Sequence, residues 1–407
     1  MSLSPIELKL ADTIARRGES MLHDLAAHVA IPTGHNFTAG LDEYRGLLRS
    51  RLEALGAAIE MRDGRAAPQW LALPGNDQES DRSAHIAPIL VARRAANRSR
   101  RVLLCGHLDT VHNPHGPFRE LAVSPDGRTV VGPGAVDMKG GILVMLTALE
   151  ALHECGVDLD WTVVLNSDEE RGSFESDHVL TELARQCDVG IVVEPALADG
   201  SLAIERMGSG QFRIEVRGRA AHVGREFEKG VSAVTNLGEI LVALSRMADP
   251  RNGMIVNVGP IVGGKATNIV PDYAACWGNM RIGDEAAAQV LDAKLDALAT
   301  PAPCGAMPSV TVHKAWNRPA KPLTDEVRAL AEKARQAAED LGQSLPFAAT
   351  GGVCDGNILQ AAGLPTIDTL GVRGGNLHRT DEFVEVASLV ERAQLMAILL
   401  SRLAAGK

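Results

Sequence analysis

The most constraining feature of this sequence is a series of short apolar runs, each followed by polar residues that can bind a metal or carry a proton. The clearest cases are Val102–Cys105 before His107 and Asp109, Trp161–Leu165 before the segment NSDEERGS, and Ile191–Val193 before Glu194. Short unbroken apolar runs are typical of strands that are buried on both faces of a sheet. Because segments with helical periodicity separate these runs, the pattern predicts a largely parallel sheet covered by helices.

The pattern changes near residue 204. From there to about residue 317 the expected order is strand, helix, two strands, helix and strand, which is the ferredoxin-like order. Helix–strand alternation then resumes, with helices expected at 323–341 and 387–404. We therefore predict an α/β fold, with a larger domain built from residues 1–204 and 318–407 and an inserted α+β domain at 205–317. Helical periodicity also covers residues 5–31 and 41–56.

Composition excludes some classes of function. The chain has 407 residues and a formal net charge of -10, which argues against nucleic-acid binding. No apolar run approaches the roughly 18 residues of a membrane span, so no membrane partner is expected. The N-terminal segment lacks the apolar core of a secretory signal, which favours a cytoplasmic protein, although a trimmed periplasmic leader stays open. Six cysteines without a CxxC pair indicate free thiols in a reducing compartment.

Candidate metal ligands and proton carriers lie at five places along the chain. They are His107 and Asp109, then Asp137 in GAVDMKGG, then Asp168, Glu169 and Glu170, then Glu194, and finally His378 in GGNLH. Each signal alone has an ordinary explanation, such as a structural histidine, a helix N-terminus or a glycine-rich turn. Together they favour a metal site, because several carboxylates that converge without a cation would repel one another. Imidazole and carboxylate groups are ligands that zinc accepts.

The same segments carry a family resemblance. HLDTV, GPGAVDMKGG, NSDEERGSFES, the pair EP and the final GGNLH resemble the M20 metallopeptidases over nearly the whole chain. NSDEERGSF and GLPTIDTLGVRGGNLHRTDEFV are most similar to the glutamate carboxypeptidase branch of that family. The resemblance implies two zinc ions per subunit, with cobalt or manganese as substitutes.

The resemblance also implies roles for individual residues. Asp137 is expected to bridge the two metals, His107 and Glu194 to complete one metal site, and Glu170 and His378 to complete the other. Asp109 is expected to orient His107, and Glu169 to act as the general base. A cis peptide bond is expected between Asp137 and Met138.

The inserted domain resembles the dimerisation or lid domain of the same family, so a homodimer is expected. His222 in GRAAHVG is expected to reach the active site of the partner subunit. Asn268, Arg281, Arg318 and Gly352 are expected to bind substrate. An arginine at such a site suits a substrate with a free carboxylate, since its guanidinium group binds a carboxylate through two parallel hydrogen bonds.

These expectations define one main function and its alternatives. The main prediction is a two-zinc hydrolase that cleaves the amide bond to a C-terminal amino acid with a free carboxylate, in a small peptide or an N-acyl amino acid. The first alternative is an N-acyl-amino-acid deacylase of the acetylornithine deacetylase type. A more remote alternative is a non-catalytic metal-binding or peptide-binding protein, against which the intact Glu169 argues. An aminopeptidase is also open, although no acidic cluster for an α-ammonium group is evident.

Overall fold

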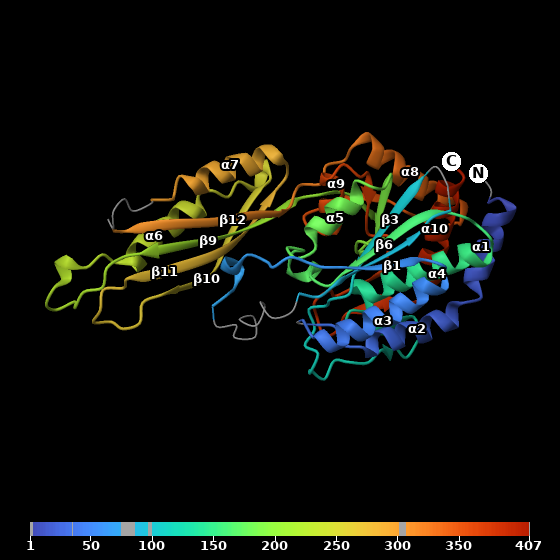
Figure 1. Ribbon diagram of the computed structural model, residues 1–407, viewed down its shortest axis with the longest axis horizontal. Helices are drawn as coiled ribbons and strands as arrows, with labels where there is room; N and C mark the ends of the chain where they lie inside the picture. Colours follow the sequence, from blue (N-terminus) through green and yellow to red (C-terminus); the bar gives the residue numbers. More distant parts are fainter. Residues whose placement is uncertain (1–2, 35, 75–85, 97–99, 301–306, 407) are drawn as a thin grey trace.

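The protein has two lobes of unequal width (Figure 1). The structure, a computed structural model, describes residues 3–34, 36–74, 86–96, 100–300 and 307–406. Both chain ends lie in the wide lobe, so the chain leaves this lobe, forms the narrow lobe and returns. Cys304 lies outside the described residues, and the other five cysteines are free.

The wide lobe contains a six-stranded sheet in the order β1-β2-β6-β3-β7-β14. Its strands are β1 (Ala58–Arg62), β2 (Ile89–Arg94), β3 (Arg101–His107), β6 (Asp160–Asn166), β7 (Val189–Val192) and β14 (Thr366–Ile367). β3 is parallel to both β6 and β7, and β14 is parallel to β7, which confirms the prediction of a mostly parallel sheet. β1 and β2 form an antiparallel edge that the sequence pattern did not predict.

Helices cover both faces of this sheet. They are α1 (Pro5–Ala15), α2 (Gly18–Ala30), α3 (Thr38–Ala54), α4 (Gly140–Glu154), α5 (Asp177–Ala184), α8 (Asp325–Asp340), α9 (Asp355–Ala361) and α10 (Val386–Ala404). Successive side chains of β3 point to opposite faces, so Leu104 joins the larger core while Leu103 and Cys105 join the core under α5 and α9. The expected helical stretch 5–31 is two helices, because α1 ends at Ala15 and α2 starts at Gly18.

The narrow lobe is a four-stranded antiparallel sheet in the order β10-β11-β9-β12, with two helices on it. The elements are β9 (Gly208–Arg217), α6 (Ala233–Ser245), β10 (Met254–Gly263), β11 (Tyr273–Ile282), α7 (Glu285–Asp296) and β12 (Ser309–Arg318). This order confirms the ferredoxin-like prediction. Each helix starts after a capping side chain, since Ser232 accepts from the Thr235 N–H and Asp284 from the Ala287 N–H. The lobe buries a separate apolar core.

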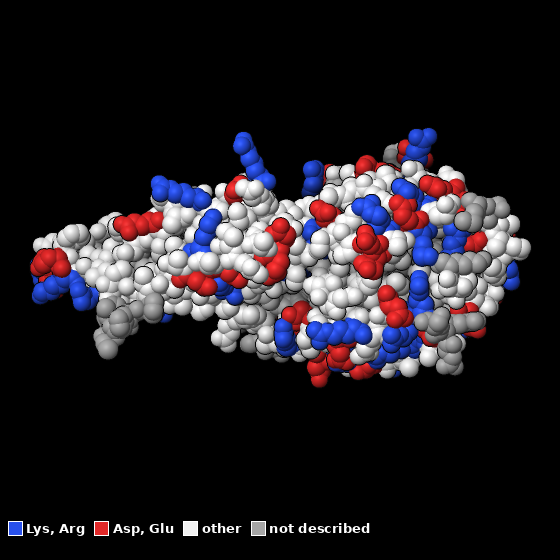
Figure 2. Space-filling view, turned by 90° about the horizontal axis from the view of Figure 1, so that it is seen from above, with Lys and Arg blue, Asp and Glu red and all other residues white. Residues whose placement is uncertain are grey.

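Two small sheets complete the wide lobe. One pairs β8 (Leu202–Arg206) with β13 (Phe347–Thr350), and the other joins β4 (Ala122–Val123), β5 (Thr129–Val131), β15 (Gly374–Gly375) and β16 (Phe383–Glu385). Among the described helices, none combines the length and apolarity needed to cross a bilayer. On the face shown in Figure 2, acidic and basic side chains are interspersed over both lobes.

Candidate metal centre and adjoining cavity

The parallel strands bring the predicted polar residues to one edge of the large sheet. His107 ends β3 and is paired in register with Asn166, the last residue of β6. The turn η4 (Glu169–Arg171) follows β6, and Glu194 follows β7 by two residues. Since neighbouring parallel strands end on the same side, the side chains that follow them converge at the carboxyl edge of the sheet.

The segment that carries Asp137 is held by Glu382. A short π-type turn, η3 (Ala135–Lys139), precedes α4, and its Asp137–Met138 peptide bond is cis, as expected. The buried Glu382 carboxylate accepts hydrogen bonds from the backbone N–H groups of Gly134, Val136 and Asp137 at 2.8–3.1 Å. Sequence reasoning missed Glu382, because a lone glutamate 245 residues from Asp137 gives no local signal of this contact.

The candidate ligands converge around Asp137. His107 Nε2 lies 3.2 Å from Asp137 Oδ1, and His378 Nε2 lies 3.6 Å from Asp137 Oδ2 and 3.3 Å from Glu170 Oε2. Ligand atoms of His107, Asp137 and Glu170 all lie within 4.8 Å of one another. The same holds for His107, Glu169 and Glu194. The structure thus brings together all five residues that the sequence proposed as ligands.

Asp109 contacts both the first histidine and the adjacent glutamates. Its backbone carbonyl lies 2.9 Å from His107 Nδ1, and its carboxylate lies 3.5 Å from the same nitrogen. The carboxylate also accepts the backbone N–H groups of Glu169, at 3.3 Å, and Glu170, at 3.0 Å. Asp109 therefore fixes the His107 ring and the start of η4 at the same time.

Burial and mutual repulsion perturb the titration of this cluster. Burial raises the pKa of Glu169 to about 8 and raises the pKa of Glu194 well above its usual value. Hydrogen bonds to Asp137 and Glu170 raise the pKa of His378 to about 10. Burial opposes charging of His107, yet its hydrogen bonds to Asp109 and Asp137 raise the pKa of this residue well above its usual range. The protonation of each carboxyl and imidazole group in this buried cluster therefore depends on the charges of its neighbours.

These residues fit bound metal. The set offers two imidazole nitrogens and several carboxylate oxygens, which are zinc ligands. Glu194 Oε1 is buried without a hydrogen-bond partner among the described residues, and a buried carboxylate in that condition calls for a cation. The donor set and this unpartnered oxygen both support a metal site.

A cavity of about 370 Å³ adjoins the cluster between the two lobes. Glu170 lines it from the wide lobe, while Ser209 and Arg281 line it from the narrow lobe. Arg281 Nη1 is buried without a hydrogen-bond partner among the described residues. Burial, together with the nearby charge of Arg318, lowers the pKa of the Arg281 guanidinium. An uncompensated guanidinium facing a cavity is suited to bind an anionic group.

Arg318 also lines the cavity, but protein groups engage it. Its Nη2 lies 2.7 Å from Glu169 Oε1 and donates to the Glu169 carbonyl at 2.9 Å and to Ser173 Oγ at 2.8 Å. Asp355 Oδ1 lies 3.4 Å from the same nitrogen. Arg318 is the last residue of β12, so the narrow lobe ends directly on the turn that carries Glu169.

His222 and Asn268 lie far from this cavity within one chain. Both are exposed, and they sit together because the Val223 N–H donates to the Asn268 carbonyl at 3.1 Å. The segments that carry them follow β9 and β10, at the end of the narrow lobe that points away from the wide lobe (Figure 1). β11 spans the lobe from Tyr273 at that end to Arg281 at the cavity, a separation of roughly 26 Å for extended chain.

Gly352 lies beside the cavity rather than in its lining, which includes the next residue, Val353. Its carbonyl accepts a hydrogen bond from Arg206 Nη1 at 3.0 Å. Arg206 in turn pairs with the buried Asp368 at 2.8 Å. No sequence motif predicts this ion pair, because its two partners lie 162 residues apart.

Comparison with known proteins gives one family. The sequence profile of peptidase family M20/M25/M40 matches residues 103–402. Carboxypeptidase G2 from Pseudomonas sp. (strain RS-16) is 28% identical over 392 residues, covering 91% of this chain and 92% of the relative. A succinyl-diaminopimelate desuccinylase from Methylobacterium radiotolerans is 30% identical over 310 residues, covering 71% of this chain and 77% of the relative.

Solved structures share the fold. A tripeptidase from Staphylococcus aureus superposes with a TM-score of 0.73 at 22% identity, covering 95% of this chain and 99% of the other. A metallo-carboxypeptidase from Sulfolobus solfataricus superposes with a TM-score of 0.68 at 15% identity, again covering 95% and 99%. These likenesses establish the two-lobed architecture.

Proposed function

The chain belongs to peptidase family M20/M25/M40, and we propose that it is a two-zinc hydrolase that cleaves the amide bond to a C-terminal amino acid with a free carboxylate. One observation carries this proposal: the same cavity is lined by Glu170, a candidate metal ligand, and by Arg281, whose Nη1 has no hydrogen-bond partner in the described part of the chain. This cavity offers the leaving amino acid an anion-binding group close to the reacting bond.

The convergence of the five candidate ligands supports the assignment that the family resemblance implies. Asp137 would bridge the two ions, His107 and Glu194 would complete one site, and Glu170 and His378 would complete the other. A pair of zinc ions held there would polarise the substrate carbonyl and lower the pKa of a bound water toward neutrality. Asp109 fixes the His107 ring for this purpose.

Glu169 is proposed as the general base. It accepts a proton from the attacking water as the water oxygen bonds to the carbonyl carbon. The C–N bond then breaks, the acyl part leaves as a carboxylic acid, and Glu169 returns the proton to the leaving amine. Burial, which raises the pKa of Glu169 to about 8, suits a group that must both accept and release a proton near neutral pH.

The narrow lobe is proposed as a lid and dimerisation domain, with its boundaries at about 205 and 317. Arg281 holds the free carboxylate of the leaving amino acid. His222, together with Asn268, acts in the cavity of the partner subunit, where His222 stabilises the negative charge on the carbonyl oxygen. Both residues are exposed, and they lie toward the Tyr273 end of β11, roughly 26 Å along the strand from Arg281, which supports this arrangement. Gly352 contributes backbone close to the substrate.

An N-acyl-amino-acid deacylase is the second candidate. Curated relatives include a carboxypeptidase G2 and several succinyl-diaminopimelate desuccinylases, and both kinds of name fit release of an amino acid with a free carboxylate. A panel of N-acyl amino acids, dipeptides and folate-like glutamates, assayed with zinc and with a chelator, separates the two. Zinc-dependent release of the C-terminal amino acid is expected. Binding of these compounds without any turnover would instead favour the non-catalytic alternative.

A further inference from the structure

One wall of the cavity beside the candidate metal centre is formed by a connecting segment between two strands of the large sheet. The strap, residues 64–73, lies between β1 and β2 in the sequence and contacts the wide lobe at Arg65 and the narrow lobe at Trp70. Its Leu71 and Leu73 line the cavity together with Phe174 from the segment after η4. A volume of about 370 Å³ is within the range of small-molecule sites, so this wall bounds space that a substrate can fill.

The strap is attached to both lobes. In the wide lobe, the Arg65 N–H donates to the Glu175 carbonyl at 2.9 Å. In the narrow lobe, Trp277 Nε1 donates to the Trp70 carbonyl at 3.0 Å, and the Trp70 ring stacks on His313 with centroids 6.0 Å apart. These contacts tie the strap to both lobes, so that Leu71, next to Trp70, is part of a preformed wall.

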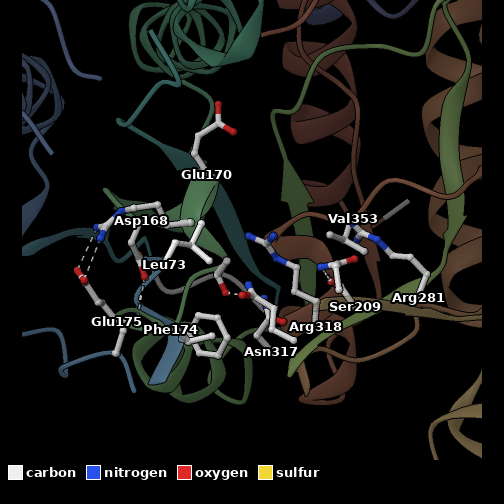
Figure 3. A pocket seen from close by; sticks show the side chains of 16 residues that line it. Leu73, Asp168, Glu170, Phe174, Glu175, Ser209, Arg281, Asn317, Arg318 and Val353 are labelled. Atoms are coloured by element: carbon white, nitrogen blue, oxygen red, sulfur yellow. Dashed lines mark hydrogen bonds and ion pairs between the residues drawn. The ribbon is translucent and has the colours of Figure 1, made fainter. Parts of the chain in front are cut away.

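The two ends of the cavity differ in character. Figure 3 shows Leu73 and Phe174 on one side of Arg318, with Ser209 and Arg281 on the other side. At the Leu73 end, the charge of Arg171 is compensated by Glu175 at 3.3 Å. At the opposite end, Arg281 Nη1 has no hydrogen-bond partner among the described residues. An anion therefore binds best at the Arg281 end, and an uncharged apolar group at the Leu73 end.

From this asymmetry we propose that the strap and Phe174 form an apolar acyl subsite, which selects substrates whose acyl group is bulky and apolar. The inference rests on the proposed function, since it takes the free carboxylate of the leaving amino acid to be bound by Arg281. With that end fixed, the acyl group extends toward Leu71, Leu73 and Phe174. Aromatic and branched aliphatic acyl groups are preferred over acetyl, which fills little of the subsite, and over succinyl, whose second carboxylate lacks an uncompensated cation there.

The test compares one amino acid with four acyl groups. With zinc-loaded enzyme, kcat/KM is measured for the N-benzoyl, N-(3-methylbutanoyl), N-acetyl and N-succinyl derivatives of L-glutamate. The benzoyl substrate should exceed the acetyl substrate by at least about 10-fold, with the succinyl substrate poorest. Leu73→Ser and Phe174→Ser should each lower the benzoyl-to-acetyl ratio by about 10-fold. Leu8→Ser is the matched control, because Leu8 is an exposed leucine on α1.

A variant that gains activity on one substrate excludes general damage to the enzyme as the cause of the changed ratios. Leu73→Lys places a cation at the apolar end and should raise kcat/KM for the succinyl substrate by about 10-fold while lowering it for the benzoyl substrate. Preference for acetyl or succinyl groups in the wild type, or ratios that stay unchanged in all three variants, would overturn the subsite. Failure of the proposed function looks different, since none of the four substrates would then be hydrolysed.

Discussion

At the scale of single residues, charged side chains that bind no metal themselves hold the candidate ligands and Glu169 in position. Glu382 holds the backbone of the Asp137 segment, Asp109 holds His107 and η4, and Arg318 holds Glu169. The sequence identified Asp109 through its position in HLDTV, but it gave no sign of Glu382. The difference is physical, because Glu382 acts through backbone N–H groups distant in sequence and carries no motif of its own.

Glu382→Gln should weaken metal binding by about 10-fold to 100-fold, because the amide group cannot accept all the hydrogen bonds that the carboxylate accepts. Competition with a chelator of known affinity measures the change. Glu385→Gln is the control, since Glu385 pairs with Arg373 and contacts none of the candidate ligands in the described structure. Equal zinc affinity in the wild type and Glu382→Gln would show that the hydrogen bonds of Glu382 do not contribute to metal binding.

Arg318→Met should lower kcat by about 10-fold to 100-fold with a smaller change in KM, because Glu169 loses the guanidinium that fixes its carboxylate. Arg318→Lys should recover part of the rate. Arg328→Met, an exposed substitution on α8, is the control. A rise in KM at constant kcat would instead identify Arg318 as a direct substrate ligand, which is the role its sequence position first suggested.

At the scale of elements, the sequence predicted those helices and strands that the local periodicity of apolar residues determines. The buried strands β3, β6 and β7 and the order of elements in the narrow lobe followed from local patterns. The antiparallel β1–β2 edge and the β8–β13 pair did not, because strand pairing between distant segments is set by tertiary packing. The strap is a similar case, since only the fold brings Trp70 against His313.

The packing of α2 against α3 predicts that the folding stability of the protein depends on pH. His28 is buried, and Tyr44 Oη lies 3.2 Å from His28 Nδ1. Burial lowers the pKa of His28 to about 3, so between pH 6.5 and 3 the unfolded chain binds a proton that the folded chain does not. Stability therefore falls as pH falls through this window. At pH 4.5 this proton uptake lowers the free energy of unfolding by about 3 kcal/mol relative to neutral pH.

His28→Gln should make the free energy of unfolding of the metal-free protein less dependent on pH between 6.5 and 4.5. Denaturant titrations at several pH values in this range measure it. His23→Gln, on the exposed side of the same helix, should leave the slope unchanged. An identical slope in His28→Gln and the wild type would contradict the assignment.

At the scale of the whole molecule, one chain does not assemble every proposed catalytic group. The narrow lobe brings Arg281 to the cavity, whereas the segment after β9, which contains His222, lies at the far end of this lobe. A homodimer joined through the narrow lobes would complete both sites, and movement of the lobes would open and close the cavity. The sequence predicted this arrangement through its family resemblance, since no local pattern specifies which chain His222 serves.

Hybrid dimers test the arrangement. His222→Ala and Glu169→Gln proteins should each be nearly inactive, yet an equal mixture should recover about a quarter of wild-type activity. Half of the dimers are then mixed, and one of the two sites in each mixed dimer has both groups intact. No recovery, after subunit exchange has been demonstrated with labelled chains, would place His222 outside the partner's site.

The most direct test of the central claim compares Glu169→Gln with Glu170→Gln, measuring zinc content and turnover in parallel. Glu169 acts on protons and Glu170 binds metal, so Glu169→Gln should keep two zinc ions per chain while losing about 10²–10⁴-fold in kcat. Glu170→Gln should lose zinc, and excess zinc should restore part of its rate. Loss of metal in Glu169→Gln with a normal rate once zinc is restored would reverse the two roles. Full activity in both variants would contradict the two-zinc hydrolase itself.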